Sequence, residues 1–95
     1  MGEFGRSPKI NTNGGRDHWG NVFSVAMAGG GVKQGHVHGQ SDQVGGEPKS
    51  GTVKPEDIIA TIFHCLGLSP EQTITDHQGR PHPITRGHPI KQILL

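Results

Sequence analysis

The sequence has few of the residues that hold a large hydrophobic core together. Hydrophobic residues make up 29% of its 95 positions, tyrosine is absent and there is one tryptophan. Sixteen glycines and seven prolines accompany this shortage, and both residue types favour loops over regular layers. A chain of this size can bury about 60 to 68% of its unfolded surface, which allows one core only. We therefore expect one small, loop-rich domain with a thin core.

Three further absences exclude whole classes of protein. The single cysteine, Cys65, rules out an internal disulfide and lies in an apolar helical pattern, which favours a small buried hydrophobe over a reactive thiol. No apolar run approaches the roughly 18 to 20 residues that cross a bilayer, and the N-terminus does not resemble a signal peptide. The scattered charges sum to +1. The sequence therefore predicts no nucleic-acid partner and no membrane segment, and leaves the localisation open.

Two segments predict regular secondary structure. Residues 21–28 form a short apolar run that ends at three glycines, which is typical of a strand buried on both faces in a parallel sheet. Residues 55–66 predict an amphipathic helix, because Pro55 suits its first position and Gly67 offers a left-handed stop. We expect this helix to anchor the core through its five large apolar side chains, which are Ile58, Ile59, Ile62, Phe63 and Leu66.

The first twenty residues show no sustained period of 2 or 3.6 and predict a long loop. Loops of this length inside a compact domain are mostly functional or disordered. The segment concentrates charged and imidazole side chains, namely Glu3, Arg6, Arg16, Asp17 and His18. This concentration favours a functional loop, which leads directly into the expected strand at residues 21–28.

Two pairs of residues in this loop have chemistry of their own. Asp17 and His18 offer a carboxylate and an imidazole, ligand types that suit Zn or Mn when other segments complete the shell. Glu3 and Arg6 form the second pair, and a guanidinium can hold a sulfate or phosphate through two parallel hydrogen bonds. Residue types alone favour the plainer alternatives, which are a salt bridge between Asp17 and Arg16 or a capped turn, and solvated loop charges.

Histidines elsewhere in the chain offer another interpretation. His36 and His38 lie two apart on an expected edge strand, so their side chains would share one face and could bind a metal together. A His-rich metal buffer would add three more histidines, which are His77, His82 and His88. No third ligand lies near His36 and His38 in the sequence, and exposed loop histidines remain the simpler interpretation.

Several motifs resemble an uncharacterised sulfatase-like family of the alkaline phosphatase superfamily. They are Glu3-Phe4-Gly5-Arg6-Ser7-Pro8, Gly15-Arg16-Asp17-His18-Trp19-Gly20-Asn21, Ala28-Gly29-Gly30-Gly31, the stretch from Pro55 to Gly67, and Asp76 with Gly79-Arg80-Pro81. The resemblance covers nearly the whole chain. It implies an α/β fold, part of a doubly wound parallel sheet, in which residues 1–95 are the C-terminal portion of a sulfatase-like domain without its nucleophile-bearing N-terminal part.

The resemblance also implies a site. The superfamily contains metal-dependent hydrolases and transferases of sulfate and phosphate esters, and His18 falls where one of their metal-binding histidines lies. Glu3-Phe4 falls where they have an Asp-His pair, and Phe4 cannot bind a metal. The implied ligands of a divalent metal (Zn, Mn or Ca) are therefore His18, Asp17 and Glu3, while Arg6 and Arg16 would hold the anionic group.

The expected function follows from this resemblance. The complete domain would hydrolyse a small sulfate or phosphate ester, and the isolated chain, which carries no catalytic nucleophile, would be inactive. Its partner would be the missing N-terminal part of the same domain, and full-length members of the family are often exported. The alternative is a non-catalytic binding or scaffold remnant, in which the loop over residues 1–20 recognises an anion or another chain.

Overall fold

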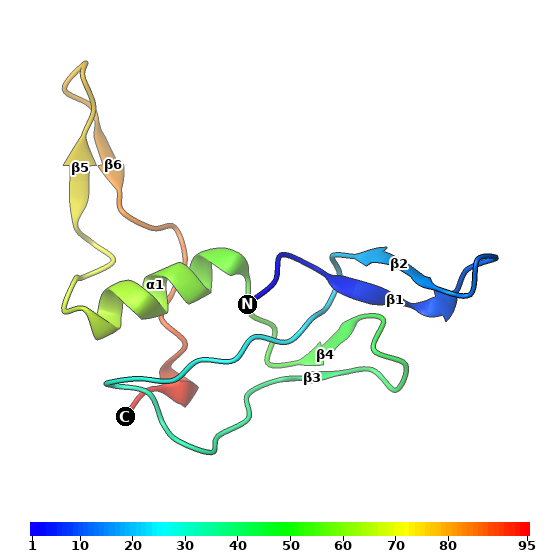
Figure 1. The fold of residues 1–95 in the computed structure, drawn as a ribbon. Coiled ribbons are helices and arrows are strands. Elements are labelled where there is room, and N and C mark those ends of the chain that lie inside the picture. Colours follow the sequence, from blue (N-terminus) through cyan, green and yellow to red (C-terminus); the bar gives the residue numbers. More distant parts are fainter. The chain divides into compact units, whose positions relative to one another are not determined.

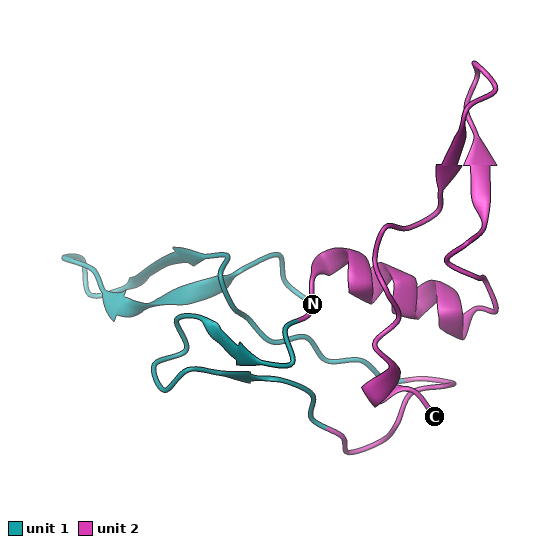
Figure 2. Ribbon diagram, turned by 180° about the vertical axis from the view of Figure 1, so that it is seen from behind, with its two compact units in different colours: residues 1–28, 37–52 teal, residues 29–36, 53–95 magenta.

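The computed structural model describes residues 1–95, which divide into two compact units. Unit 1 comprises residues 1–28 and 37–52, and unit 2 comprises residues 29–36 and 53–95 (Figure 2). The elements along the chain are β1 (Gly5–Ile10), β2 (Arg16–Trp19), β3 (Gln40–Ser41), β4 (Pro48–Ser50), α1 (Pro55–Cys65), β5 (Thr73–Thr75), β6 (Pro81–Pro83) and the 3-10 helix η1 (Lys91–Ile93) (Figure 1).

The expected doubly wound parallel sheet is wrong. The strands form three separate two-stranded sheets, β1–β2, β3–β4 and β5–β6, and each pair is antiparallel. Residues 21–28, the expected central strand, form no strand, and Val25 is 37% exposed. A strand buried on both faces needs hydrogen-bonded neighbours and covering helices, and no segment of the chain pairs with residues 21–28.

The expected long loop over residues 1–20 is instead an antiparallel hairpin formed by β1 and β2. Its turn is organised by Asn11, whose Oδ1 accepts the backbone N–H groups of Asn13 and Gly15, both at 3.0 Å. Gly14 has φ +76°, which glycine adopts without steric cost. Asn-Gly sequences favour such turns, so Asn13-Gly14 was the local signal for this hairpin.

Unit 1 holds its two hairpins together with side chains that follow β2. The indole N–H of Trp19 donates to the carbonyl oxygen of Gly46 at 2.7 Å, and Gly46 is buried. Asn21 Nδ2 donates to Glu47 Oε1 at 2.6 Å. These contacts fix the end of β2 against the segment between β3 and β4.

The predicted helix is confirmed as α1, which begins at Pro55 and ends one residue before the expected boundary. The carboxylate of Asp57 accepts the backbone N–H groups of Lys54 and His88, each at 3.0 Å. These two N–H groups, His88 first, hold the pKa of Asp57 below its ordinary value. Asp57 therefore connects the start of α1 to the segment around His88.

The expectation that the large apolar side chains of α1 anchor the core is wrong. The buried positions of the helix are Ala60 and Thr61, which are 1% and 0% exposed. Ile59, Ile62 and Leu66 remain 45%, 41% and 69% exposed. The most buried positions of the helix therefore carry small side chains, whereas Ile58 and Phe63 are half-buried.

The core of unit 2 is correspondingly small. Its buried hydrophobic residues are Val32, Ala60 and Leu94, and Val32 forms an antiparallel bridge with Leu94. The bridge at Leu94 holds the C-terminal residues against this unit. Cys65 is exposed, so its expected burial is wrong. No helix is long and apolar enough to span a membrane.

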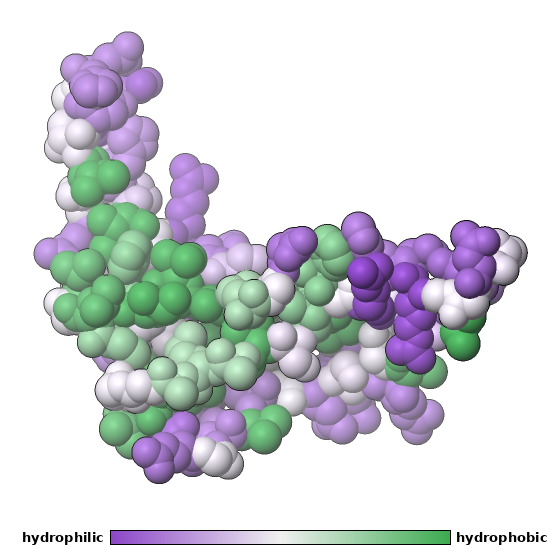
Figure 3. Space-filling view, in the orientation of Figure 1, coloured by the Kyte–Doolittle hydropathy of each residue, from purple (hydrophilic) through white to green (hydrophobic).

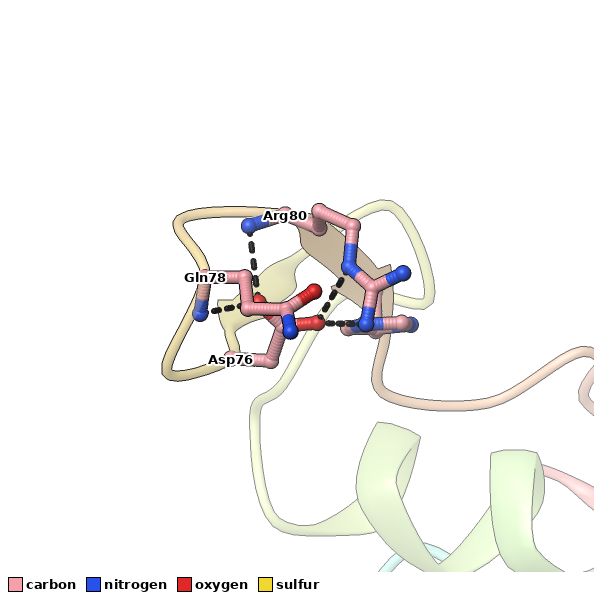
Figure 4. Close-up of polar contacts among 4 residues, drawn as sticks. Asp76, Gln78 and Arg80 are labelled. Carbon is pink, nitrogen blue, oxygen red and sulfur yellow. Dashed lines mark hydrogen bonds and ion pairs between the residues drawn. The ribbon is translucent and has the colours of Figure 1, made fainter.

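The β5–β6 hairpin of unit 2 closes around the carboxylate of Asp76 (Figure 4). This carboxylate accepts the backbone N–H groups of Gln78 and Arg80 at 2.9 Å and the Arg80 Nε–H at 2.8 Å, and it lies 2.8 Å from His82 Nε2. The His82 contact, followed by the Arg80 backbone N–H, lowers the pKa of Asp76 to about 2.

We expect this hairpin tip to loosen in acid. The pKa of Asp76 is depressed in the folded state, so its stabilising contribution is complete above the ordinary value of 3.8 and is lost as the pH falls toward 2. Amide hydrogen exchange of Gln78 and Arg80, followed by NMR, should accelerate over this range beyond the intrinsic rate. Asp76→Asn should lack this acceleration of exchange. An equal acceleration in Asp76→Asn and in the wild type would show that the Asp76 carboxylate does not hold the hairpin tip.

Candidate functional site

The β1–β2 hairpin places Arg6 directly opposite His18. Residues that face each other in an antiparallel pair project from the same side of the sheet, with Cβ atoms about 4.5 to 5.5 Å apart. Both residues are exposed. Because strand side chains alternate, Arg16 lies on the same side of β2 as His18. We call Arg6, Arg16 and His18 the cationic face of the hairpin.

Phe4 lies against this face. Its ring stacks on the imidazole of His18 with centroids 4.0 Å apart and planes inclined by 26°. The Cζ atom of Arg6 lies 5.7 Å from the centre of the same ring, within the range of a cation–π contact. Phe4 is half-buried, whereas His18 is exposed. Phe4, which cannot bind a metal, thus positions the imidazole of His18 and the guanidinium of Arg6.

The guanidinium of Arg6 makes one hydrogen bond within the chain. Its Nη1 donates to the backbone oxygen of Arg16 at 3.3 Å, and its remaining N–H groups have no partner in the chain. A guanidinium carries five N–H donors in a planar fork. Arg6 therefore keeps the donors that recognise two oxygens of one anion. The side chain of Arg16 is exposed and makes no hydrogen bond or ion pair.

Asp17 lies on the other side of β2 and not beside His18. Its Oδ1 accepts a hydrogen bond from Asn11 Nδ2 at 3.1 Å. Its backbone N–H donates to the hydroxyl of Ser7 at 3.0 Å, and Ser7 is buried. The alternative of a salt bridge with Arg16 is not formed. Asp17 acts here as a structural residue of the hairpin, and its charge points away from the cationic face.

The structure does not bring the expected metal ligands together. Glu3 is exposed, and Asp17 and His18 face opposite sides of β2. No group of three or more His, Cys, Asp or Glu residues is arranged to hold a metal ion, and His36 and His38 form no such group either. The residues of this chain therefore do not fit a complete metal site.

Comparison with known protein families gives one match. The model of the family described as "Protein of unknown function (DUF1501)" matches residues 1–94. The chain belongs to this family. Membership of an uncharacterised family, indicated by the sequence motifs, is thereby confirmed. No curated protein and no solved structure matches the chain, so the relation to sulfatases remains a prediction.

Sequence reasoning missed two features of this family member's site. The first is the role of Phe4, which the sequence presented only as a lost ligand. The second is the common side of Arg16 and His18, which follows from the alternation of strand residues once Arg16–Trp19 is recognised as β2. The turn sequence between β1 and β2 could have indicated both features, because a hairpin determines which residues of its two strands face each other.

Proposed function

We propose that the cationic face binds the sulfate or phosphate group of a small anionic ester, as part of a sulfatase-like hydrolase domain of the alkaline phosphatase superfamily. The observation that carries the proposal is the cross-strand pairing of Arg6 with His18. Two independent donors on one face suit a tetrahedral oxyanion, because each can reach a different oxygen. The sequence motifs around both residues give the same class of ligand by resemblance.

Each residue of the cationic face would have a different role in binding the anion. The free N–H groups of Arg6 would donate in parallel to two oxygens, an arrangement that gives geometric specificity as well as charge. The imidazole of His18, oriented by Phe4, would donate to a third oxygen. Arg16 would add positive charge at the edge. Asp17, the carboxylate next to His18 in the sequence, projects from the other side of β2.

A divalent metal (Zn, Mn or Ca) remains part of the proposal only for a larger assembly. Because His18, Asp17 and Glu3 do not converge, a metal would need ligands from another polypeptide, such as the remaining part of a sulfatase-like domain. We therefore derive no catalytic step through a metal. The role that we propose for the isolated chain is recognition of the anionic group, without hydrolysis.

The test of this proposal is calorimetric titration with inorganic sulfate and phosphate at constant ionic strength, balanced with chloride. We expect saturable binding with a dissociation constant on the order of millimolar, as suits a few exposed charge-assisted hydrogen bonds. We also expect no turnover of aryl sulfates or phosphates with Zn, Mn or Ca. Heats indistinguishable from chloride would contradict the binding, and turnover that disappears in His18→Ala would contradict the inactivity.

A second candidate is a binding module that is not catalytic in any assembly. The stacking of Phe4 on His18 favours it, because the ring covers one face of the imidazole. Titration of the completed domain, in which this chain is joined to its N-terminal part, with Zn, Mn and Ca distinguishes the two. The binding-module proposal predicts anion binding that is unchanged by each metal, whereas a hydrolase site completed by a partner would bind a metal in the completed domain.

A further inference from the structure

The three asparagines of the chain differ in how their side-chain amides are held. Asn11 Oδ1 accepts two backbone N–H groups, and Asn11 Nδ2 donates to Asp17 Oδ1 at 3.1 Å. Asn21 Nδ2 donates to Glu47 Oε1 at 2.6 Å. Asn13 is exposed, and only its backbone N–H makes a hydrogen bond. Asn13 is therefore the asparagine whose side-chain amide is free to react.

The residue that follows each asparagine makes the same distinction. The backbone nitrogen of that residue can attack the amide carbon of the asparagine side chain, and a β-branched side chain beside the nitrogen is stiff and crowds the approach. Thr12 and Val22, which follow the other two asparagines, are both β-branched. Asn13 is followed by Gly14, and the space where a Cβ atom of Gly14 would lie has no atom within 4 Å.

We propose that Asn13 is a site of spontaneous deamidation. The backbone nitrogen of Gly14 forms a bond to Cγ of Asn13, the bond from Cγ to the side-chain nitrogen breaks, and this nitrogen leaves as ammonia with the proton of the Gly14 N–H. Water then opens the resulting cyclic imide at either carbonyl carbon, which gives aspartate or isoaspartate at this position. One water is consumed for each ammonia released, and neither an oxidant nor a reductant is needed.

The turn between β1 and β2 restrains this reaction. The attacking nitrogen of Gly14 donates its hydrogen to the backbone oxygen of Asn11 at 3.1 Å. The side chain of Asn11 also holds the N–H groups of Asn13 and Gly15, both at 3.0 Å. The nitrogen must leave its hydrogen bond and swing toward Cγ, so the turn has to open first. Local opening of an exposed turn requires little free energy, so the fold slows the reaction without preventing it.

Water, the second reactant, has free access to this turn. Residues 12–15 are all exposed. The end of the β1–β2 hairpin that carries the turn lies at the right of Figure 1, and Figure 3 shows mostly hydrophilic residues there. The imide can therefore be hydrolysed without any further change in the structure.

The isoaspartate product would alter the hairpin. Its backbone runs through the former side chain and contains an extra carbon, which lengthens the turn between Asn11 and Gly15. The backbone N–H of Asn11 donates to the oxygen of Gly15 at 2.7 Å, and Ile10 pairs with Arg16 beside it. Because loop length sets the register of a hairpin, these pairs next to the turn are the first that we expect to be lost. The inference does not depend on the proposed anion binding.

Peptide mapping of the wild-type chain after incubation at neutral and at mildly alkaline pH tests the inference. Trypsin releases residues 10–16, which contain Asn11 and Asn13, and residues 17–33, which contain Asn21. Mass-spectrometric fragmentation locates the converted residue. We expect conversion at Asn13 before any at the other two asparagines, faster at the higher pH because the attacking nitrogen must lose its proton. Earlier conversion of Asn11 or Asn21, or an Asn13 that stays intact, would overturn the inference.

Two variants and a denatured sample test the restraint by the turn. Asn11→Ala removes the side-chain hydrogen bonds of the turn and should accelerate conversion about tenfold. Thr12→Ala is the matched control, because Thr12 is exposed in the same turn and its side chain makes no hydrogen bond; its rate should stay within about twofold of the wild type. The wild type in urea should convert at least as fast as Asn11→Ala. Equal rates in all four samples would show that the turn does not hold the Gly14 nitrogen away from Asn13.

Discussion

Gly87→Ala should destabilise unit 2 by about 1 to 3 kcal/mol or more, as overpacking of a closed site does. Gly87 is buried, and a Cβ atom at this position would overlap the backbone oxygen and carbon of Glu56. The neighbouring atoms are helix backbone, which cannot move aside without breaking the contacts of Thr85 and Ile90 with α1. Urea denaturation followed by circular dichroism measures the change in the free energy of unfolding.

The matched control for this substitution is Gly30→Ala. Gly30 lies in the same unit, has no atom within 4 Å of a built Cβ and does not have a positive φ. It should be neutral or slightly stabilising, because alanine reduces the freedom of the unfolded chain. Equal midpoints for Gly87→Ala and Gly30→Ala would show that the 85–90 segment does not pack on α1 as described.

Arg6→Ala should weaken sulfate binding about tenfold. A hydrogen bond to a charged group contributes about 1.5 to 3 kcal/mol, and exposure to solvent brings the effect of Arg6 to the lower end of this range. Arg6→Lys keeps the charge but loses the planar fork, so it should recover only part of the affinity. Calorimetric titration at constant ionic strength measures each dissociation constant.

The control for the loss of charge is Lys49→Ala. Lys49 is exposed on β4 in the same unit and has no place on the cationic face. Its removal changes the net charge by the same amount, so it should leave sulfate affinity within about twofold. If Lys49→Ala weakens binding as much as Arg6→Ala, the interaction is a general attraction of anions and not recognition at the hairpin.

The helix was the most predictable part of the fold. Its apolar spacing, Pro55 at the start and Gly67 beyond the end are local signals, and α1 differs from the prediction by one residue at its C-terminal end. The face that it buries was not predictable, because that depends on the return of residues 85–90 past Thr61. Such contacts between distant segments leave no periodic pattern in the sequence.

The sheets were predicted less well for a related reason. An apolar run such as residues 21–28 indicates a strand only where another segment pairs with it, and the chain contains no such segment. The parallel sheet was expected from this apolar run and from the family resemblance. By contrast, the turn at Asn11–Gly15 carries a local signal for the β1–β2 hairpin, although the segment has no sustained period of 2 or 3.6 and for that reason predicts a loop.

For the site, the sequence identified the relevant residues but not their grouping. Arg6, Arg16 and His18 were all candidates, and the hairpin places them on one face. Asp17, paired with His18 because the two are adjacent, projects from the opposite side, since neighbouring residues of a strand alternate. Adjacency in sequence therefore suggested a metal pair where the strand geometry separates the two ligands.

The most direct test of the cationic face is an NMR titration of the wild-type chain with sulfate against chloride at equal ionic strength. We expect saturable shifts of the Arg6 Nε–H and the His18 ring signals with sulfate, smaller shifts at Phe4, and none at Asp76, whose hairpin lies in unit 2. Shifts of the same size with chloride, or shifts spread over all basic residues without saturation, would contradict it.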